Sequence, residues 1–172
     1  LGDPRYKLVI SHETGDEGLE YAEWLKDHAG NRGVDLRTLN LRISDPLNPD
    51  VNRKDLYTLW DVYPHSDFVT YPSLYEGFGN AFLEAVYFKK PLLINRYAIF
   101  VRDIEPKEFD LIAMDGYLTR KTVQRVRKAL ESTEHREKMV NTNFEIAKKY
   151  FSFAKLHRLL DLLLTNFFGS EV

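Results

Sequence analysis

The fold of this chain is decided by one stretch, Tyr71-Pro72-Ser73-Leu74-Tyr75-Glu76-Gly77-Phe78-Gly79-Asn80-Ala81-Phe82-Leu83-Glu84-Ala85-Val86. It predicts the end of a β-strand, a loop with two glycines and the start of an α-helix. The first turn of such a helix has backbone N–H groups without intrahelical partners, and these groups favour an anion. We therefore expect a phosphate to bind at this loop.

Two glutamates in this stretch point to a ligand with hydroxyl groups. From Ala81 to Phe88 every residue except Glu84 is apolar, which predicts a helix that is buried all round. A buried carboxylate needs hydrogen-bond donors, and a vicinal diol supplies them. Glu76 precedes the glycine turn and can reach the same cavity. The alternative is an ordinary tight turn, with Glu76 in solvent and Glu84 paired with a buried Lys or Arg.

The rest of the chain alternates between two hydrophobic patterns. Short apolar runs that predict strands lie at residues 6–10, 34–41, 68–71, 91–95 and 111–114. Helical patterns lie at residues 19–29, 52–63, 81–88, 119–132, 134–150 and 153–168. Such alternation predicts an α/β fold with a doubly wound parallel sheet and helices on both faces. Ligands in this architecture bind at the carboxyl ends of the strands.

Composition narrows the class of protein. The length of 172 residues predicts a single domain over residues 1–172. The 24 Lys and Arg residues nearly balance 26 Asp and Glu residues, so the charge gives no reason to expect nucleic acid as a partner. Cysteine is absent, and no apolar run approaches the ~18–20 residues that span a bilayer. We expect a soluble, cytoplasmic protein without a transmembrane segment.

Other candidate positions are weaker. His12 follows the first predicted strand on the ligand side of the sheet, although a histidine in a loop is more often a surface residue. No His or carboxylate pair has metal-ligand spacing with a third member, so no metal site is predicted. The helix at residues 153–168 has apolar residues on more than one stripe, which predicts self-association through that helix.

The central stretch resembles a known signature. The pattern Tyr-Pro-Ser-x-x-Glu-Gly-Phe-Gly-Asn-x-x-x-Glu-Ala at residues 71–85, with Pro91 before a hydrophobic strand, is similar to the Glu-x7-Glu motif of retaining GT-B glycosyltransferases. This is the glycosyltransferase group 1, or glycogen-synthase-like, family. Phe151-Ser152-Phe153 resembles the Phe-Ser-Trp segment before that family's final helix. The resemblance implies the Rossmann-like C-terminal half of a GT-B fold with additional C-terminal helices.

The resemblance also implies a substrate and a set of site residues. The substrate would be a nucleotide-diphosphate sugar, used without a metal or other cofactor. Glu76 would be the catalytic-site residue that contacts the hydroxyls of the donor sugar, and Glu84 would hold the ribose. The remaining donor-binding positions would be Ser73, Gly77, Phe78, Gly79, Asn80 and Leu83.

Two departures from the family pattern shape the expectations. The family's N-terminal acceptor domain and its diphosphate-binding Arg and Lys have no counterpart here, so we expect a fragment whose partner is its own N-terminal domain and which is inactive alone. Ser11-His12-Glu13 stands where the family has a glycine pair. Two alternatives to an enzyme stay open. One is a non-catalytic module that binds a nucleotide or nucleotide sugar, and the other is a structural α/β domain with a vestigial site.

Overall fold

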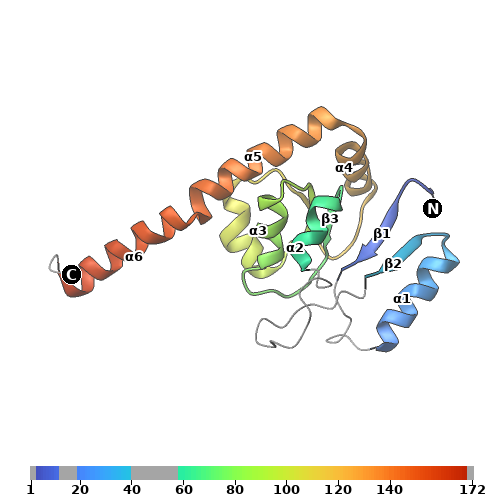
Figure 1. Ribbon diagram of the computed structural model, residues 1–172, viewed down its shortest axis with the longest axis horizontal. Coiled ribbons are helices and arrows are strands. Elements are labelled where there is room, and N and C mark those ends of the chain that lie inside the picture. Colours follow the sequence, from blue (N-terminus) through green and yellow to red (C-terminus); the bar gives the residue numbers. More distant parts are fainter. Residues whose placement is uncertain (1–2, 12–18, 40–57, 170–172) are drawn as a thin grey trace. The chain divides into compact units, whose positions relative to one another are not determined.

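The computed structural model describes residues 3–11, 19–39 and 58–169 (Figure 1). The chain divides into two compact units, Leu1–His65 and Ser66–Val172, and each unit is described by itself. That residues 1–172 form one nucleotide-sugar-binding domain stays a prediction. His12, the weaker candidate of the sequence analysis, lies outside the described residues.

The first unit contains a pair of parallel strands and a helix between them in sequence. Strand β1 (Lys7–Ile10) pairs with β2 (Asp35–Thr38), and Leu8 lies opposite Leu36. Helix α1 (Leu19–Asn31) connects the two strands and is followed by Gly33 at a φ of 66°. A left-handed glycine commonly ends a helix, and α1 runs two residues past the helical pattern predicted for residues 19–29.

The unit ends in two short helical turns. Helix α2 (Leu59–Val62) begins after Thr58, whose backbone N–H donates to the Asp61 carboxylate at 2.6 Å. A 3-10 turn, Tyr63–His65, follows α2. Residues 52–57 of the helix predicted for 52–63 lie outside the described residues.

The second unit is built on a three-stranded parallel sheet in the order β3-β4-β5. These strands are β3 (Val69–Tyr71), β4 (Leu92–Asn95) and β5 (Ile112–Met114). Every residue of the middle strand β4 is buried, so both of its faces are covered. The strand predicted for residues 91–95 is therefore confirmed, and its continuous apolar run is typical of a strand buried on both faces.

Helices follow the strands as the alternating pattern predicts (Figure 1). Helix α3 (Asn80–Tyr87) connects β3 to β4, and α4 (Arg120–Glu131), α5 (Thr133–Phe151) and α6 (Phe153–Phe168) follow β5. Between β4 and β5 lie a π-helical turn, Phe100–Ile104, and a 3-10 turn, Glu105–Lys107. Parallel strands with flanking helices make this the α/β class that the sequence predicts.

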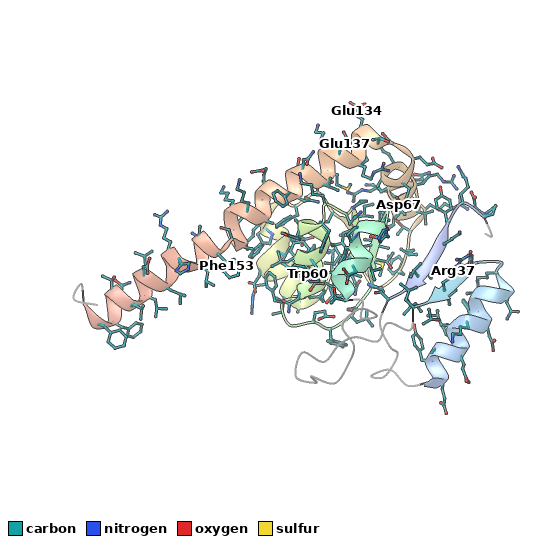
Figure 2. The ribbon with its side chains drawn as sticks, in the orientation of Figure 1. Arg37, Trp60, Asp67, Glu134, Glu137 and Phe153 are labelled. Carbon is teal, nitrogen blue, oxygen red and sulfur yellow. The ribbon has the colours of Figure 1, made fainter. Side chains whose placement is uncertain are left out.

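Serine residues separate the last three helices. Ser132 accepts a hydrogen bond from the backbone N–H of His135 at 3.3 Å and caps the start of α5. Ser152 caps α6 in the same way through Lys155. Within the second unit, α6 continues beyond the end of α5 and extends away from the sheet (Figure 1). Figure 2 labels Phe153 at the first residue of α6.

The hydrophobic core of the second unit lies between the sheet and its helices. Leu93 and Ile112 of the sheet pack with Ala129 of α4 and Met139 of α5. A second, aromatic cluster joins Phe82 to Phe109 at 5.0 Å between ring centroids, and Phe78 to Phe151 at 5.2 Å. These ring contacts pack α3 and the loop before it against α5 and Phe109.

Burial of α3 differs from the prediction of a helix covered all round. Phe82, Ala85 and Val86 are buried, but Tyr87 is 59% exposed and Glu84 is half-buried. The cause is that α3 packs against β3, β4 and α5, which cover one side of it. The apolar composition of a short helix therefore overstated its burial.

Helix α6 keeps its apolar surface exposed. Its leucines are 41–53% exposed, Phe167 is 76% exposed, and no residue of the helix is buried. Self-association through this surface stays a prediction. Of the helices that the structure describes, none is long and apolar enough to cross a membrane.

Candidate functional site

The site lies at the carboxyl end of β3, in the loop that leads into α3. Gly79 immediately precedes the helix and has φ 86° and ψ 74°, in the left-handed region. Its carbonyl accepts a hydrogen bond from the Phe82 N–H at 3.0 Å. Among the described residues no side chain caps this N-terminus, and an uncapped helix N-terminus favours an anion.

The two glycines of the loop differ in what surrounds them. A Cβ atom on Gly79 would collide with the hydroxyl of Tyr97 and lie 3.2 Å from Cε1 of Tyr71. A Cβ atom on Gly77 would meet nothing within 4 Å. Gly79 is therefore required by both its backbone conformation and its close contacts, whereas Gly77 is not required by either.

Two tyrosines hold this loop. The Tyr97 hydroxyl donates to the Phe78 carbonyl oxygen at 2.9 Å, and the Tyr71 hydroxyl lies 3.3 Å from the position that a Cβ atom on Gly79 would take. The two rings meet edge to face, with centroids 6.4 Å apart at 89°. Burial, followed by the nearby Glu76 carboxylate, raises the pKa of Tyr71 well above its usual value. Burial and the Glu76 charge raise the pKa of Tyr97 to about 12.

A shallow pocket of about 420 Å³, wide open to solvent, lies beside the loop. Its lining residues are Leu74, Tyr75, Glu76, Gly77 and Ala98. Among these described residues only Glu76 has a carboxylate, which accepts hydrogen bonds from hydroxyl groups. The Tyr75 side chain is 92% exposed, and no Lys or Arg is among these residues. The pocket thus suits a neutral, hydroxyl-bearing group beside an anion at the helix end.

The structure brings several of the predicted residues together. Glu76 and Gly77 line the pocket, and Gly79 and Asn80 form the start of α3. The ring of Phe78 packs against Phe82 and Phe151. Its backbone, and not its ring, is therefore the part that lies in the site.

The remaining predicted residues lie around this centre. The Ser73 carbonyl accepts a hydrogen bond from Nδ2 of Asn95 at 3.2 Å. Leu83 and Glu84 are half-buried on α3 and are not among the lining residues of the pocket. Glu84 was expected to be buried, and that expectation is wrong because only one side of α3 is covered.

Asn95 connects the loops on both sides of β4. It is 4% exposed, donates to Ser73 as described, and accepts from the Gly116 N–H through Oδ1 at 2.7 Å. Both bonds are to main-chain atoms, so the amide fixes the two loops to the end of the middle strand. Asn95 is not among the residues predicted from the sequence, although a polar residue that ends a fully apolar strand is a signal for such a role.

Arg96 is the basic residue next to Asn95, and acidic residues surround it. Its guanidinium donates to both carboxylate oxygens of Glu105 at 2.8 Å, and it approaches Asp115 at 3.2 Å. These bonds to Glu105 and Asp115 raise the pKa of Arg96 above its usual value. The guanidinium therefore links the residue after β4 to the 3-10 turn at Glu105 and to the residue after β5.

Tyr71 and Tyr97 are the main residues that sequence reasoning missed. Tyr71 stands at the first position of the recognised motif, and Tyr97 follows the β4 strand on the ligand side. Their positions at or just after the ends of strands were visible, but their contact with the glycine loop was not. Over the ranges that the structure describes, no three His, Asp or Glu side chains gather as metal ligands would.

Comparison with known proteins identifies relatives of the chain. The family model for glycosyl transferases group 1 matches residues 50–145. Mannosylglucosylglycerate synthase of Thermotoga maritima is 32% identical over 166 residues, which is 89% of this chain and 36% of that protein. The synthase of the same name from Petrotoga mobilis is 40% identical over 98 residues, 57% of this chain and 22% of that protein. The chain thus spans about a third or less of each relative.

A solved structure has the same fold. It is the C-terminal domain of a glycosyl transferase group 1 family protein from Francisella tularensis, with a TM-score of 0.64 and 16% identity, and the match covers 87% of this chain and 72% of that one. The predicted Rossmann-like fold of a GT-B C-terminal half is thereby confirmed. Because the family model matches more than half of the 172 residues, the chain belongs to the group 1 glycosyl transferases.

Proposed function

We propose that the chain forms the donor-binding part of a retaining glycosyltransferase that moves a hexosyl group from a nucleotide sugar to an acceptor hydroxyl. The observation that carries this proposal is the place of Glu76. Its carboxylate lines a pocket beside the uncapped N-terminus of α3, so a hydroxyl-rich sugar and an anionic diphosphate fit side by side. Membership of the family supports the same assignment.

Each part of the donor has a counterpart in the proposed site. The backbone N–H groups of Asn80 and Ala81 bind the diphosphate, and Glu76 accepts from the sugar hydroxyls. Glu84, one turn further along α3, accepts from the ribose diol. Ser73, Gly77 and Leu83 complete the surroundings of the donor, and Phe78 and Gly79 shape the turn between sugar and diphosphate.

The reaction needs no nucleophile from this chain. The bond between the anomeric carbon and the diphosphate oxygen breaks, and the acceptor oxygen bonds to the anomeric carbon on the same face. The acceptor proton passes to the departing phosphate. We propose that this transfer occurs in the cytoplasm and uses no metal ion or cofactor besides the nucleotide sugar.

The names of the relatives give the first compounds to test. Both are mannosylglucosylglycerate synthases, so a nucleotide-activated mannose and a glucosylglycerate acceptor are the first pair. The chain spans only part of these relatives, and no Lys or Arg lines the described pocket. We therefore propose that the chain binds the donor but transfers sugar only together with an acceptor-binding domain.

The test is calorimetric titration of the chain with UDP, GDP and ADP and with a hexose conjugate of each. The proposal expects one nucleotide to be selected and its sugar conjugate to bind through Glu76. Binding without turnover in a protein that includes the acceptor domain would favour the alternative of a non-catalytic nucleotide-sugar module. Absence of selective binding to any of the six compounds would overturn the proposal and leave a structural domain with a vestigial site.

A further inference from the structure

Two tyrosine hydroxyls lie beside the loop at residues 76–79. Tyr97 donates to the Phe78 carbonyl at the end of the loop, at 2.9 Å. The Tyr71 hydroxyl lies 3.3 Å from the position that a Cβ atom on Gly79 would take, and the Glu76 carboxylate is close enough to raise the pKa of Tyr71. The two rings contact each other edge to face, so the two tyrosines form one packed pair. Tyr71 ends β3, and Tyr97 follows the neighbouring strand β4, 26 positions later in the sequence.

Tyr71 is suited to orient a carboxylate. It is the last residue of β3, so its backbone is fixed by the sheet, and its side chain is half-buried. Its phenol is protonated at neutral pH, so its hydroxyl can donate a hydrogen bond to the Glu76 carboxylate. A carboxylate that receives one fixed donor has fewer orientations available and can offer its other lone pairs to a ligand.

Tyr97 is suited to shape the turn. The residue is 3% exposed, and its hydroxyl occupies the space in which a side chain at position 79 would lie. The same hydroxyl fixes the Phe78 carbonyl, which belongs to the peptide unit that precedes Gly79. Rotation of that peptide would change the direction of the N–H groups at the start of α3.

We propose that Tyr71 and Tyr97 are positioning residues of the donor site. Tyr71 holds the Glu76 carboxylate in the pocket, and Tyr97 holds the Phe78–Gly79 turn so that the first N–H groups of α3 face the diphosphate. The inference rests on the proposed function and assigns a separate role to each tyrosine. Tyr71 affects the sugar, whereas Tyr97 affects both the diphosphate and the sugar.

The first experiment measures a thermodynamic cycle between Tyr71 and Glu76. Wild type, Tyr71→Phe, Glu76→Gln and the double variant are titrated with the selected nucleoside diphosphate and with its hexose conjugate. Tyr71→Phe is expected to weaken the sugar conjugate by about three- to tenfold, the range of one net hydrogen bond, and to leave the diphosphate unchanged. In the Glu76→Gln background the same substitution is expected to have no further effect, because Tyr71 acts through Glu76.

The second experiment uses stability and needs no ligand. Gly79→Ala, Tyr97→Phe and the double variant are unfolded with urea. Removal of the Tyr97 hydroxyl relieves its collision with the new methyl group, so the double variant is expected to be more stable than the sum of the single effects. The expected difference is at least about twofold in the unfolding equilibrium constant. Tyr117→Phe, at a tyrosine that is 69% exposed in the turn before α4, is the matched control for loss of a phenol.

The outcomes separate the inference from the proposed function. If Glu76→Gln weakens the sugar conjugate but Tyr71→Phe does not, the role of Tyr71 is wrong while the proposed function stands. If Glu76→Gln has no effect, or wild type binds no nucleotide, the proposed function fails and the inference fails with it. Strictly additive effects of Gly79→Ala and Tyr97→Phe overturn the role of Tyr97. If Tyr117→Phe changes the unfolding equilibrium as much as Tyr97→Phe does, the role of Tyr97 is also overturned. Such a result would show a general effect of losing a phenolic hydroxyl.

Discussion

Helices α3 and α6 are both rich in apolar residues, but their side chains lie in opposite surroundings. In α3, Phe82 and Ala85 are fully buried against the sheet and the other helices. In α6, Leu163 is 52% exposed and Phe167 is 76% exposed. The difference shows that apolar composition indicates how much of a helix surface can be buried. The elements packed against the helix decide how much of that surface is buried.

The largest expected effect tests this contrast directly. Phe82→Ala opens a cavity beneath α3, and we expect a loss of about 3–5 kcal/mol in the free energy of unfolding. Leu163→Ala in α6 removes an exposed side chain and is expected to change that free energy by no more than about 0.5 kcal/mol. Urea denaturation followed by circular dichroism measures both. Similar losses in the two variants would show that α6 is packed in solution.

The next effect sharpens the comparison at Glu84 of α3, the proposed ribose contact. Glu84→Gln replaces hydrogen bonds to a charged group, worth about 1.5–3 kcal/mol each, by neutral ones worth about 0.5–1.5 kcal/mol, so over the two hydroxyls of a diol nucleotide affinity should fall by roughly one to two powers of ten. Glu76→Gln should instead spare the nucleoside diphosphate and weaken the nucleotide sugar. Calorimetric titration of both variants with both ligands is the measurement. Equal losses for both ligands in both variants would contradict the division between ribose and sugar.

The start of α3 provides a smaller and internally controlled effect. Gly79→Ala places a side chain at φ 86° against the Tyr97 hydroxyl, and we expect a loss of about 1–3 kcal/mol in stability. Gly77→Ala, two positions earlier, has open space around the new methyl group and should be nearly neutral. Urea denaturation curves of Gly79→Ala and Gly77→Ala measure the two losses in the free energy of unfolding. A large loss in Gly77→Ala would mean that the loop is more tightly packed than its contacts indicate.

The smallest effect on folding is expected in α6, where association should change instead. Leu163→Glu with Phe167→Glu places two charges on one exposed apolar face, so stability should be retained and self-association should decrease. Ala154→Glu with Thr165→Glu adds the same charge to the other side of α6 and serves as the control. Light scattering over a range of concentrations measures the outcome. If wild type is already monomeric at high concentration, the predicted self-association is wrong.

Much of the fold could be predicted because it depends on local periodicity. The run at residues 91–95 became the buried β4, and the pattern at residues 153–168 became α6 with the same bounds. The glycine motif also predicted where the loop and α3 would lie. Tertiary contacts were beyond this reasoning, since no pattern shows that the Tyr97 hydroxyl fills the space beside Gly79 or that one side of α3 stays uncovered. Side chains that bond to the backbone of distant residues, such as Asn95, cannot be recognised from the sequence for the same reason.

The attachment made by Asn95 has an evolutionary consequence. Because its amide bonds the main chain at Ser73 and Gly116, neither bond depends on the identity of the side chain at those two positions. Ser73 can therefore be exchanged without losing its bond to Asn95, whereas Gly116, at a φ of 73°, favours glycine for its own backbone conformation. Under the proposed function, substitution in these loops would change the sugar preference while their backbones keep the same places, and selection would act on Asn95 more strictly than on Ser73.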